Sequence, residues 1–319
     1  MTDSAGTATT NSAGTATTIS GATVLITGVT SEVAKPVALA LAKDNEVYGA
    51  ARWKDPASRA PFEAGNVKPV FLDLVKGNLD DLPEQVDYVA HFAVMKSGKW
   101  SVDLDGNVGG VMLLMERYAD SKAFLHCSTS AVYEPHPHDE AHEDSPLGDN
   151  HRAYYLETYS ICKIAAEAAA RHGARRYDLP TTIARLNVPY GDGGGWPMFH
   201  LAQMEAGQEV ALHEVTPNVF QPIHSDDIVA TVPRLLEIAG VPPTTVNWAG
   251  DEQVSVEEWT AYLGELTGIT AKLAVSEHSL ASGRVNLKRM HELVGHTTVH
   301  WRDGMRRMVE AMRPDLLRS

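Results

Sequence analysis

The sequence predicts an α/β fold: one doubly wound parallel sheet with helices on both faces, followed by a smaller C-terminal lobe. Short apolar runs alternate with helical stretches from Thr23 to Leu186, and this alternation is typical of parallel βαβ units. A chain of 319 residues that is 44% apolar and 21% charged is also expected to be globular, with an ample core. The order loosens after Tyr190, which places the smaller lobe in the C-terminal part.

The elements follow from the apolar runs and from the turn residues between them. Strands are expected at 24–26, 46–50, 70–72, 88–94, 123–127 and 181–186. Helices are expected between them at 33–42, 108–118 and 159–172, and each crossover should be right-handed. The glycine-rich stretch 191–195 is interpreted as a flexible hinge, and helices are expected after it at 198–206, 227–239, 256–266 and 301–312.

Charge and cysteine content exclude several classes of function. With 27 basic and 41 acidic residues the net charge is −14, which argues against nucleic acid or an anionic membrane as a partner. No apolar run approaches the roughly 20 residues that a membrane span needs. Two cysteines, Cys127 and Cys162, cannot form a disulfide framework, so a cytoplasmic protein is expected.

The turn after the first strand is a candidate dinucleotide site. Gly28, Ser31 and Ala34 occupy the positions of a Gly-x-x-Gly-x-x-Gly fingerprint, whose backbone amides and helix N-terminus bind a pyrophosphate. Only the first glycine is present, and an ordinary strand–helix turn is the alternative. The residues assigned to the cofactor here are Gly28, Thr30, Ser31, Glu32 and Val33, with Glu32 expected to point to solvent.

The second and third strands indicate which dinucleotide is bound. An NAD site usually has an acidic residue at the end of the second strand, but this chain has Arg52 there. Arg52 could pair with a 2′-phosphate, so NADP is favoured and NAD remains possible. Asp73 and Leu74, after the third strand, suit an adenine contact, with a plain strand cap as the alternative for Asp73.

A catalytic group is predicted at the fifth strand and the helix after it. Ser128 and Thr129 stand at the strand end, and Tyr159 and Lys163 are four residues apart, on one face of a helix. An ammonium near a phenol favours the phenolate and lowers its pKa, as an acid/base residue needs. A hydroxyl from Thr129 or Ser128 would hold the substrate oxygen during hydride transfer.

Together these stretches resemble the extended short-chain dehydrogenases/reductases of the NAD-dependent epimerase/dehydratase family, which have a Rossmann-type sheet. The likeness covers about residues 23–312 and rests on TGVTSEVA, HFAV, Asn107, STSAVY, YSICK, RLNVPYG and PIHSDDIVA. It implies that Thr129 is the hydroxyl partner, Tyr159 the acid/base, Lys163 the residue that holds the nicotinamide ribose, and Asn107 part of the site or its proton relay. The remaining cofactor-binding residues are Phe92, Ala93, Val94, Ser128 and Val188.

The resemblance also divides the chain. Residues 1–20, where SAGTATT occurs twice, are expected to be a disordered tail. The dinucleotide-binding domain is expected at 21–189, with returning segments at about 222–248 and 293–312. The substrate lobe is then 190–221 and 249–292. A homodimer through the alanine-rich helix after Lys163 is favoured, with packing inside one chain as the alternative.

Several features of this sequence depart from the family pattern. Asn187 in RLNVPYG stands one position early relative to Tyr190-Gly191, and Ser130-Ala131 replace the acidic pair of the family's dehydratases. Phe220 stands where nucleotide-sugar enzymes typically carry a phosphate-binding arginine.

The stretch 196–223 has no Arg or Lys but has Trp196, Met198 and Phe199. A small carbonyl or alcohol substrate is therefore expected rather than a nucleotide sugar, unless Arg284, Lys288 or Arg289 folds over the pocket. The function expected is an NAD(P)-dependent oxidoreductase. A sugar epimerase and a non-catalytic NAD(P) sensor are the alternatives.

Two further features have competing interpretations. His136, His138, His142 and His151 lie among carboxylates in a proline-rich loop. A solvated loop at the border of the substrate pocket is favoured there over zinc binding, so no metal is assigned. Cys162 is interpreted as a small packing residue rather than a reactive thiol.

Overall fold

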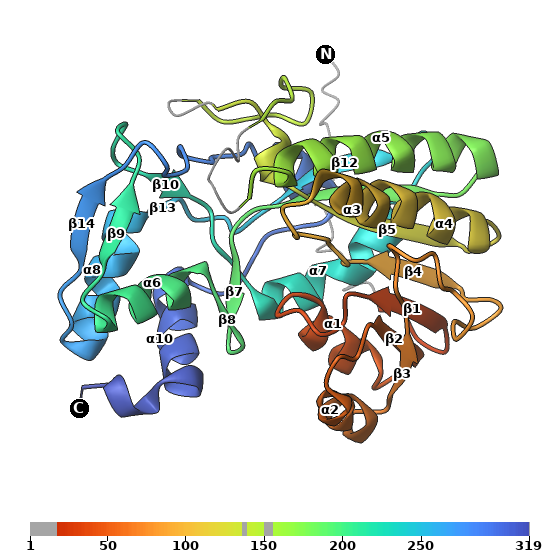
Figure 1. Cartoon of the computed structure of the whole chain (residues 1–319), viewed down its shortest axis with the longest axis horizontal. Helices are drawn as coiled ribbons and strands as arrows, with labels where there is room; N and C mark the ends of the chain where they lie inside the picture. The colour runs from red at the N-terminus through yellow and green to blue at the C-terminus, as the bar shows by residue number, and fades with distance from the viewer. Residues whose placement is uncertain (1–17, 136–138, 150–155, 319) are drawn as a thin grey trace, which may run out of the picture.

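The computed structural model describes residues 18–135, 139–149 and 156–318. Its centre is a seven-stranded sheet of order β12-β6-β5-β4-β1-β2-β3 (Figure 1). The strands are β1 (Thr23–Thr27), β2 (Glu46–Ala51), β3 (Val67–Phe71), β4 (Tyr88–His91), β5 (Ala123–Thr129), β6 (Thr181–Leu186) and β12 (Thr244–Trp248). All six neighbouring pairs are parallel. The predicted doubly wound sheet is confirmed.

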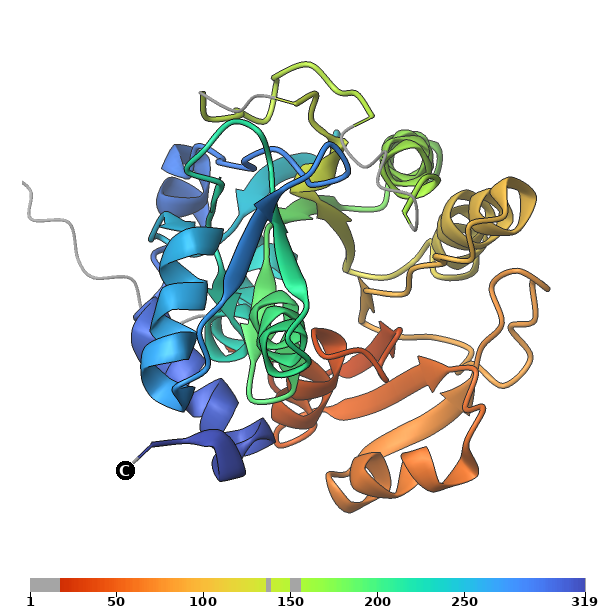
Figure 2. The ribbon, with the colours of Figure 1, turned by 60° about the vertical axis from the view of Figure 1, so that its left-hand side comes forward.

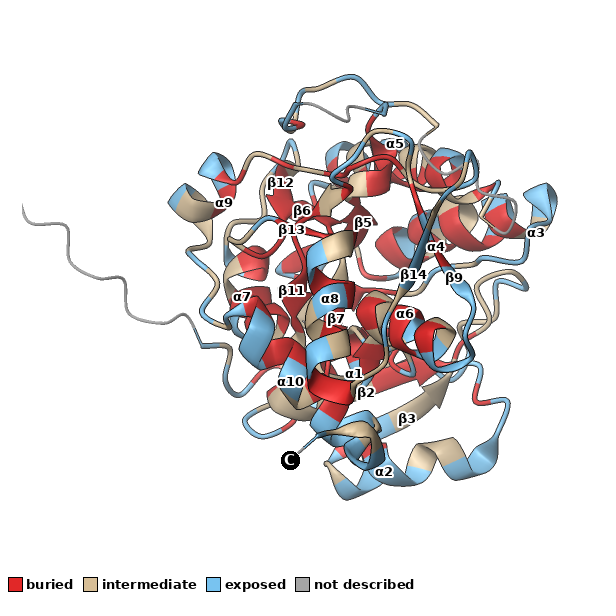
Figure 3. Ribbon diagram, turned by 90° about the vertical axis from the view of Figure 1, so that its left-hand side faces the viewer, coloured by how far each residue is buried: buried red, intermediate tan, exposed pale blue. Residues whose placement is uncertain are grey.

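Helices cover both faces of the sheet. On one face lie α1 (Ala34–Leu41) and α7 (Ser225–Glu237), and on the other α4 (Gly110–Arg117) and α5 (Tyr159–Tyr177), with α3 (Trp100–Leu104) and a π-helix at Asp105–Gly109 leading into α4 (Figure 1). Every residue of β5 and β6 is buried, as expected for strands covered on both faces. Figure 3 shows these strands in red, whereas the outlying α2 (Ala60–Ala64) is mostly exposed or intermediate.

The C-terminal lobe has a core of its own. It contains β7 (Pro189–Gly191), β8 (Gly194–Gly195), α6 (Trp196–Glu205), β9 (Glu209–Leu212), β10 (Val219–Phe220), β13 (Val254–Ser255), α8 (Val256–Thr267), β14 (Lys272–Val275) and α10 (Trp301–Met312). β11 (Ile223–His224) and α9 (Lys288–Leu293) connect the lobe to the sheet domain. In Figure 2 the blue helices lie across the molecule from the orange strands β2 and β3.

Three details differ from the sequence-based expectation. The stretch 191–195 is not a loose hinge, because Tyr190 and Gly191 pair with Gly195 and Gly194 in an antiparallel hairpin. The segment 293–312 does not simply return to the sheet domain, because α10 packs on α6 and α8 and contributes Met305 and Met308 to the core of the lobe. Ile19, assigned to the tail, packs against the core of the sheet domain, while residues 1–17 lie outside the described residues.

Candidate active site

Two adjoining cavities lie at the carboxyl ends of the strands, where open α/β sheets bind ligands. Their volumes are about 470 Å³ and 210 Å³, and Ser31, Phe92 and Val94 line both, so they form one continuous cleft. The larger cavity contains the predicted catalytic residues Thr129, Tyr159 and Lys163. The smaller contains Gly28 and Arg52.

The turn between β1 and α1 is built for close backbone approach. Gly28 has φ 69°, and a Cβ on it would lie 2.7 Å from the backbone of Ala93, so the chain needs glycine here. Ser31 takes the place of the second glycine, and its hydroxyl accepts a hydrogen bond from the Ala34 amide. The backbone amides of Thr30, Glu32 and Val33 have no partner among the described residues. A helix N-terminus with available amides suits a pyrophosphate, so this turn fits a dinucleotide despite its missing glycines.

The smaller cavity lies where β1, β2 and β3 end. Leu72, Leu74 and Ala51 give it apolar walls, and Arg52 stands at its rim, exposed and without an ion pair among the described residues. Asp73 does not line it. Asp73 instead closes a turn, accepting a hydrogen bond from the Lys76 amide at 3.4 Å and pairing with Asn78 through an isolated bridge. The structure therefore places Arg52 at the cavity and Asp73 outside it.

The predicted catalytic residues come from two elements. Thr129 ends β5, and the first two turns of α5 carry Tyr159 and Lys163. The Tyr159 side chain hydrogen-bonds to that of Thr129, and burial raises the pKa of Tyr159 to about 12 despite this bond. The ammonium of Lys163 is buried and donates to the Cys127 carbonyl at 2.7 Å. Burial rather than Lys163 therefore dominates the pKa of Tyr159 in this structure, which differs from the expected lowering.

A second lysine, Lys96, enters the site from the loop after β4. Its Nζ lies 4.7 Å from the centre of the Tyr159 ring, and it lines the larger cavity together with Glu32. Glu32 therefore faces this cleft. Partial burial raises the pKa of Glu32 and lowers that of Lys96, and their mutual attraction opposes both shifts. Lys96 was not predicted from the sequence, although a cation two residues after Val94 was the available signal.

Asn107 lies beneath the site rather than in either cavity. It is buried in the π-helix, where its side chain binds both the amide and the carbonyl of Met95, at 3.0 and 2.9 Å. Local π-geometry of this kind is frequent at functional sites. Asp103, one turn earlier, accepts from Ser97 and from the Thr158 hydroxyl, which precedes Tyr159. Together Asn107 and Asp103 fix the Lys96 loop against the start of α5.

A buried ionic network supports the end of β5. The Ser128 hydroxyl donates to Glu167 at 2.6 Å, and Arg185 forms two hydrogen bonds with the same carboxylate, at 2.9 and 2.7 Å. Arg171 adds a third cationic contact at 2.9 Å. Hydrogen bonds and charge from Arg185 hold the pKa of Glu167 below its ordinary value although burial opposes this. Ser128 lines the cavity, but its hydroxyl is committed to this network.

Asn187 has a positioning role, which could not be assigned from its shifted position in RLNVPYG. Its side-chain amide donates to Ser130 at 3.1 Å and to the Gly283 carbonyl at 2.6 Å. Its side-chain oxygen accepts from the amides of Val188 and Gln221. Both amide hydrogens are therefore used, and Asn187 joins the end of β5 to the C-terminal lobe.

The wall opposite the strand ends is apolar. Val188 and Pro189 follow β6 into this wall, and the C-terminal lobe adds Trp196, Phe199, Phe220, Leu280 and Ala281. Trp196 packs edge-on against Phe220, with ring centres 4.9 Å apart. Met198 does not line the cavity but packs against the core of the lobe. Lys96 and Lys163 are the basic residues that line this cavity in the described part of the chain.

The remaining sequence-based candidates lie elsewhere. Arg284, Lys288 and Arg289 line neither cavity, and Arg289 lies 3.7 Å from Glu143. His136, His138 and His151 fall outside the described residues, and His142 does not line the pocket. Cys162 is buried, in accord with a packing role. None of the helices in the described ranges is long and apolar enough to cross a membrane.

Comparison with known proteins identifies the family to which the chain belongs. It is 26% identical over 309 residues to dTDP-4-dehydro-6-deoxy-D-allose reductase from Streptomyces bikiniensis, covering 89% of this chain and 94% of that one. UDP-glucuronic acid 4-epimerase from Bacillus cereus, solved with NAD, matches with a TM-score of 0.77 at 19% identity over 91% of this chain and 96% of that one.

A further solved structure has the same fold. dTDP-glucose 4,6-dehydratase from Streptomyces venezuelae, solved with NAD and TYD, also gives a TM-score of 0.77, at 21% identity over 92% and 97% of the two chains. The model of the NAD dependent epimerase/dehydratase family matches residues 24–249, most of the chain. The chain therefore belongs to the NAD-dependent epimerase/dehydratase family of extended short-chain dehydrogenases/reductases.

Proposed function

We propose that this enzyme is an NADP(H)-dependent reductase or dehydrogenase that interconverts a carbonyl and an alcohol on a small, largely apolar substrate. The observation that carries the proposal is the cleft itself. The hydroxyls of Thr129 and Tyr159 meet on one wall, and Trp196, Phe199 and Phe220 form the other. A site with convergent polar groups and an apolar wall suits a substrate with one reactive oxygen on a hydrophobic frame.

In the proposed chemistry, the protein manages one proton and one oxygen atom. When bound, the dinucleotide would supply or take up a hydride at the substrate carbon. Tyr159 gives its phenolic proton to the substrate oxygen during reduction and recovers a proton during oxidation. Thr129 would donate a hydrogen bond to the same oxygen, and Lys163 would hold the nicotinamide ribose. Because burial raises the pKa of Tyr159 to about 12, Tyr159 carries its proton at neutral pH, which favours carbonyl reduction.

The choice of NADP rests on Arg52. Its guanidinium stands at the rim of the smaller cavity with no carboxylate paired to it in the described structure. An unpaired arginine at the end of β2 suits a 2′-phosphate, whereas the ribose diol of NAD calls for an acceptor. The related structures above were solved with NAD. The proposed preference of this chain for NADP therefore differs from the cofactor found in those structures.

A nucleotide-sugar reductase or epimerase is the second candidate, favoured by the dTDP-sugar reductase relative. Its substrate carries a diphosphate of about two negative charges, normally neutralised by bidentate Arg or by Lys. In the described part of the larger cavity, Phe220 and Leu280 line the lobe wall. Lys96, a cation that lines the same cavity, interacts electrostatically with the carboxylate of Glu32. An unpaired phosphate in such a site is costly.

Titration of the cofactor-loaded protein with UDP, GDP and dTDP distinguishes these candidates. We expect no binding at micromolar concentrations, and turnover of a neutral aldehyde or ketone followed by the absorbance of NADPH. Micromolar binding of any of the three nucleotides would contradict the proposal of an apolar substrate and favour a nucleotide-sugar substrate. Nucleotide cofactor binding without turnover of any carbonyl or sugar would instead favour the sensor.

A further inference from the structure

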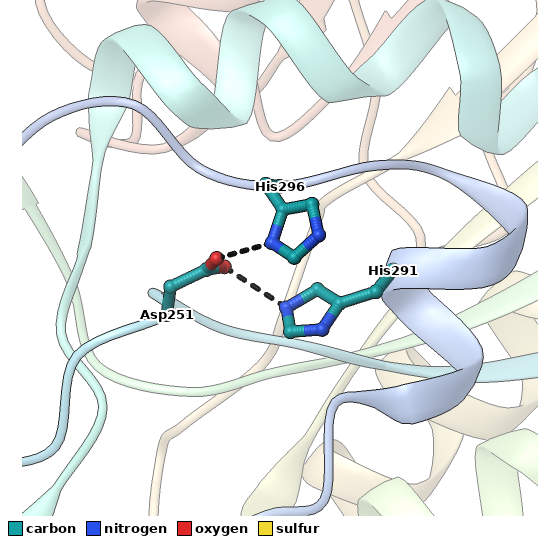
Figure 4. Close-up of side chains that lie close together, drawn as sticks. All are labelled: Asp251, His291 and His296. Atoms are coloured by element: carbon teal, nitrogen blue, oxygen red, sulfur yellow. Dashed lines mark hydrogen bonds and ion pairs between the residues drawn. The ribbon is translucent and has the colours of Figure 1, made fainter. Parts of the chain in front are cut away.

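Far from the catalytic residues in the sequence, three side chains form a cluster at the edge of the sheet domain. Asp251 follows β12, His291 lies in α9, and His296 lies in the segment between α9 and α10. His291 Nε2 lies 3.1 Å from Asp251 Oδ1, and His296 Nδ1 lies 2.6 Å from Asp251 Oδ2. Figure 4 shows both rings pointing at the one carboxylate. The cluster thus gathers two imidazoles and a carboxylate from three separate segments.

The atoms that converge here are metal-ligand atoms. One nitrogen of each histidine and one carboxylate oxygen lie within 4.8 Å of one another, and the two rings stack with centres 3.9 Å apart. Ligand atoms around a tetrahedral zinc lie about 3.3 Å apart for bonds of about 2.0 Å. The His296 side chain is 65% exposed, so its ring can turn by the small amount needed to admit an ion.

In both histidines, the ring nitrogen that faces the cluster can also be free of a proton. A neutral imidazole that binds a metal carries its proton on the other ring nitrogen. Neither His291 Nδ1 nor His296 Nε2 has a hydrogen-bond partner among the described residues. Each can therefore hold the proton while Nε2 of His291 and Nδ1 of His296 face the ion.

The carboxylate is held in place by hydrogen bonds from a neighbouring residue. Thr297 donates to Asp251 Oδ1 from both its amide and its hydroxyl, each at 3.2 Å, and the same hydroxyl accepts from the Asp251 amide at 2.9 Å. Such hydrogen-bonded support around a ligand is typical of metal sites, where it fixes the orientation of the ligand.

We propose that Asp251, His291 and His296 bind one divalent transition-metal ion, with Zn²⁺ as the best match and water completing its coordination. Two histidines and one carboxylate form a known three-residue zinc set that leaves a fourth position open. The nitrogen donors select against Mg²⁺ and Ca²⁺, which prefer oxygen. The ion would tie α9 to the loop after β12 and is separate from the Thr129–Tyr159–Lys163 site.

The position of the site connects it to the wall of the substrate cavity. The segment that supplies Ala281 and Gly283 to the cavity continues directly into α9 and His291. Gln221 joins the two sides, because its carbonyl accepts from the Gly250 amide at 3.3 Å and its side chain accepts from the Val285 amide at 2.7 Å. An ion at Asp251 would therefore fix the far end of the segment that closes the cavity.

Calorimetric titration of the metal-free, tag-free full chain with ZnCl₂ tests the proposal. We expect one Zn²⁺ per chain at micromolar or lower concentration, and no heat with MgCl₂. His291→Ala, His296→Ala and Asp251→Asn should each weaken zinc binding by more than about 100-fold, since loss of an outer support alone costs about 10–100-fold. Thr297→Val should keep the stoichiometry and weaken binding by about 10–100-fold.

The matched control is His278→Ala, which removes an exposed histidine beside Glu277 and outside the cluster. It should bind zinc as the wild type does, and all variants should keep the circular dichroism spectrum of the wild type. Co²⁺ should give visible d–d absorption with wild type and not with the His291→Ala/His296→Ala variant. Absence of zinc binding by wild type, or equal weakening by His278→Ala and His291→Ala, would overturn the site.

Discussion

The two walls of the cleft differ in what they offer a ligand. The strand-end wall carries backbone amides after β1, the hydroxyls of Thr129 and Tyr159, and the ammonium of Lys163. The lobe wall carries Trp196, Phe199 and other apolar side chains. The polar wall can manage a dinucleotide and a proton whatever the substrate is, whereas the apolar wall can only select by shape and hydrophobicity. Under the proposed function, chemistry and substrate choice therefore lie on different parts of the chain.

The largest effect is expected from Tyr159→Phe on the polar wall. It should lower kcat by about 10²–10⁴-fold, because it removes the group that transfers the proton. Cofactor affinity should stay unchanged, since the aromatic ring and Lys163 remain. Stopped-flow measurement of NADPH oxidation with calorimetry of cofactor binding checks both parts.

The pH profile shows whether a loss of activity reflects proton transfer. With a Tyr159 pKa near 12, only a small fraction of the wild type is phenolate at neutral pH, and this fraction grows about tenfold per pH unit. Wild-type kcat/KM for alcohol oxidation should rise accordingly with pH, while carbonyl reduction stays nearly flat. A Tyr159→Phe enzyme that kept near-wild-type turnover, or the same rise with pH, would remove Tyr159 from the mechanism.

On the same wall, Arg52→Ala should weaken NADPH binding by about tenfold and leave NADH unchanged. The reason is loss of a charge-assisted bond of about 1.5–3 kcal/mol, reduced here because Arg52 is exposed. Lys54→Ala, an exposed cation that lines neither cavity, is the matched control. Tighter binding of NADH than NADPH by wild type, unaltered in Arg52→Ala, would contradict the assignment.

On the lobe wall, Phe199→Ala should have a smaller effect, confined to the substrate. Phe199 is 57% exposed, so its removal costs about 1 kcal/mol of apolar contact and raises KM for an apolar carbonyl about fivefold, with little change in kcat. Val275→Ala, at an exposed position on β14 outside the cavity, should change neither constant. A fall in kcat with constant KM would show that the two walls do not divide their roles this way.

The sequence predicted six of the seven strands of the sheet, because each of the six contains an apolar run next to turn residues, but it did not predict β12. Strand β6 has the predicted bounds Thr181–Leu186, and α10 those of Trp301–Met312. The hairpin at β7 and β8 was missed because a run of glycines shows that many backbone conformations are allowed, but not which conformation is adopted. At Gly195 (φ 126°) a Cβ would lie 2.7 Å from the Pro189 carbonyl, so this glycine permits a close approach.

Most of the candidate site was also predictable, because its residues follow strands that end at one edge. Apart from Asp73 and Asn107, the residues assigned from the sequence to catalysis or to the cofactor line one of the two cavities. Lys96 was missed because a lysine in a loop is common and only the fold brings it to the Tyr159 ring. The Asp251 cluster was not predictable, because no short spacing links Asp251 to histidines 40 and 45 residues away.

The network around Glu167 has a consequence for how this enzyme can change over generations. A lone substitution of Glu167 strands the guanidinium of Arg185 in the interior, and breaking a buried pair in this way typically costs about 3–5 kcal/mol. Exchanging both for well-packed apolar residues can be close to neutral. Glu167 on α5 and Arg185 on β6 are therefore expected to be replaced together, whereas the exposed Phe199 can be replaced by itself. Under the proposed function, substrate preference can therefore change by single substitutions on the lobe wall, while Glu167 and Arg185 behind the other wall can change only together.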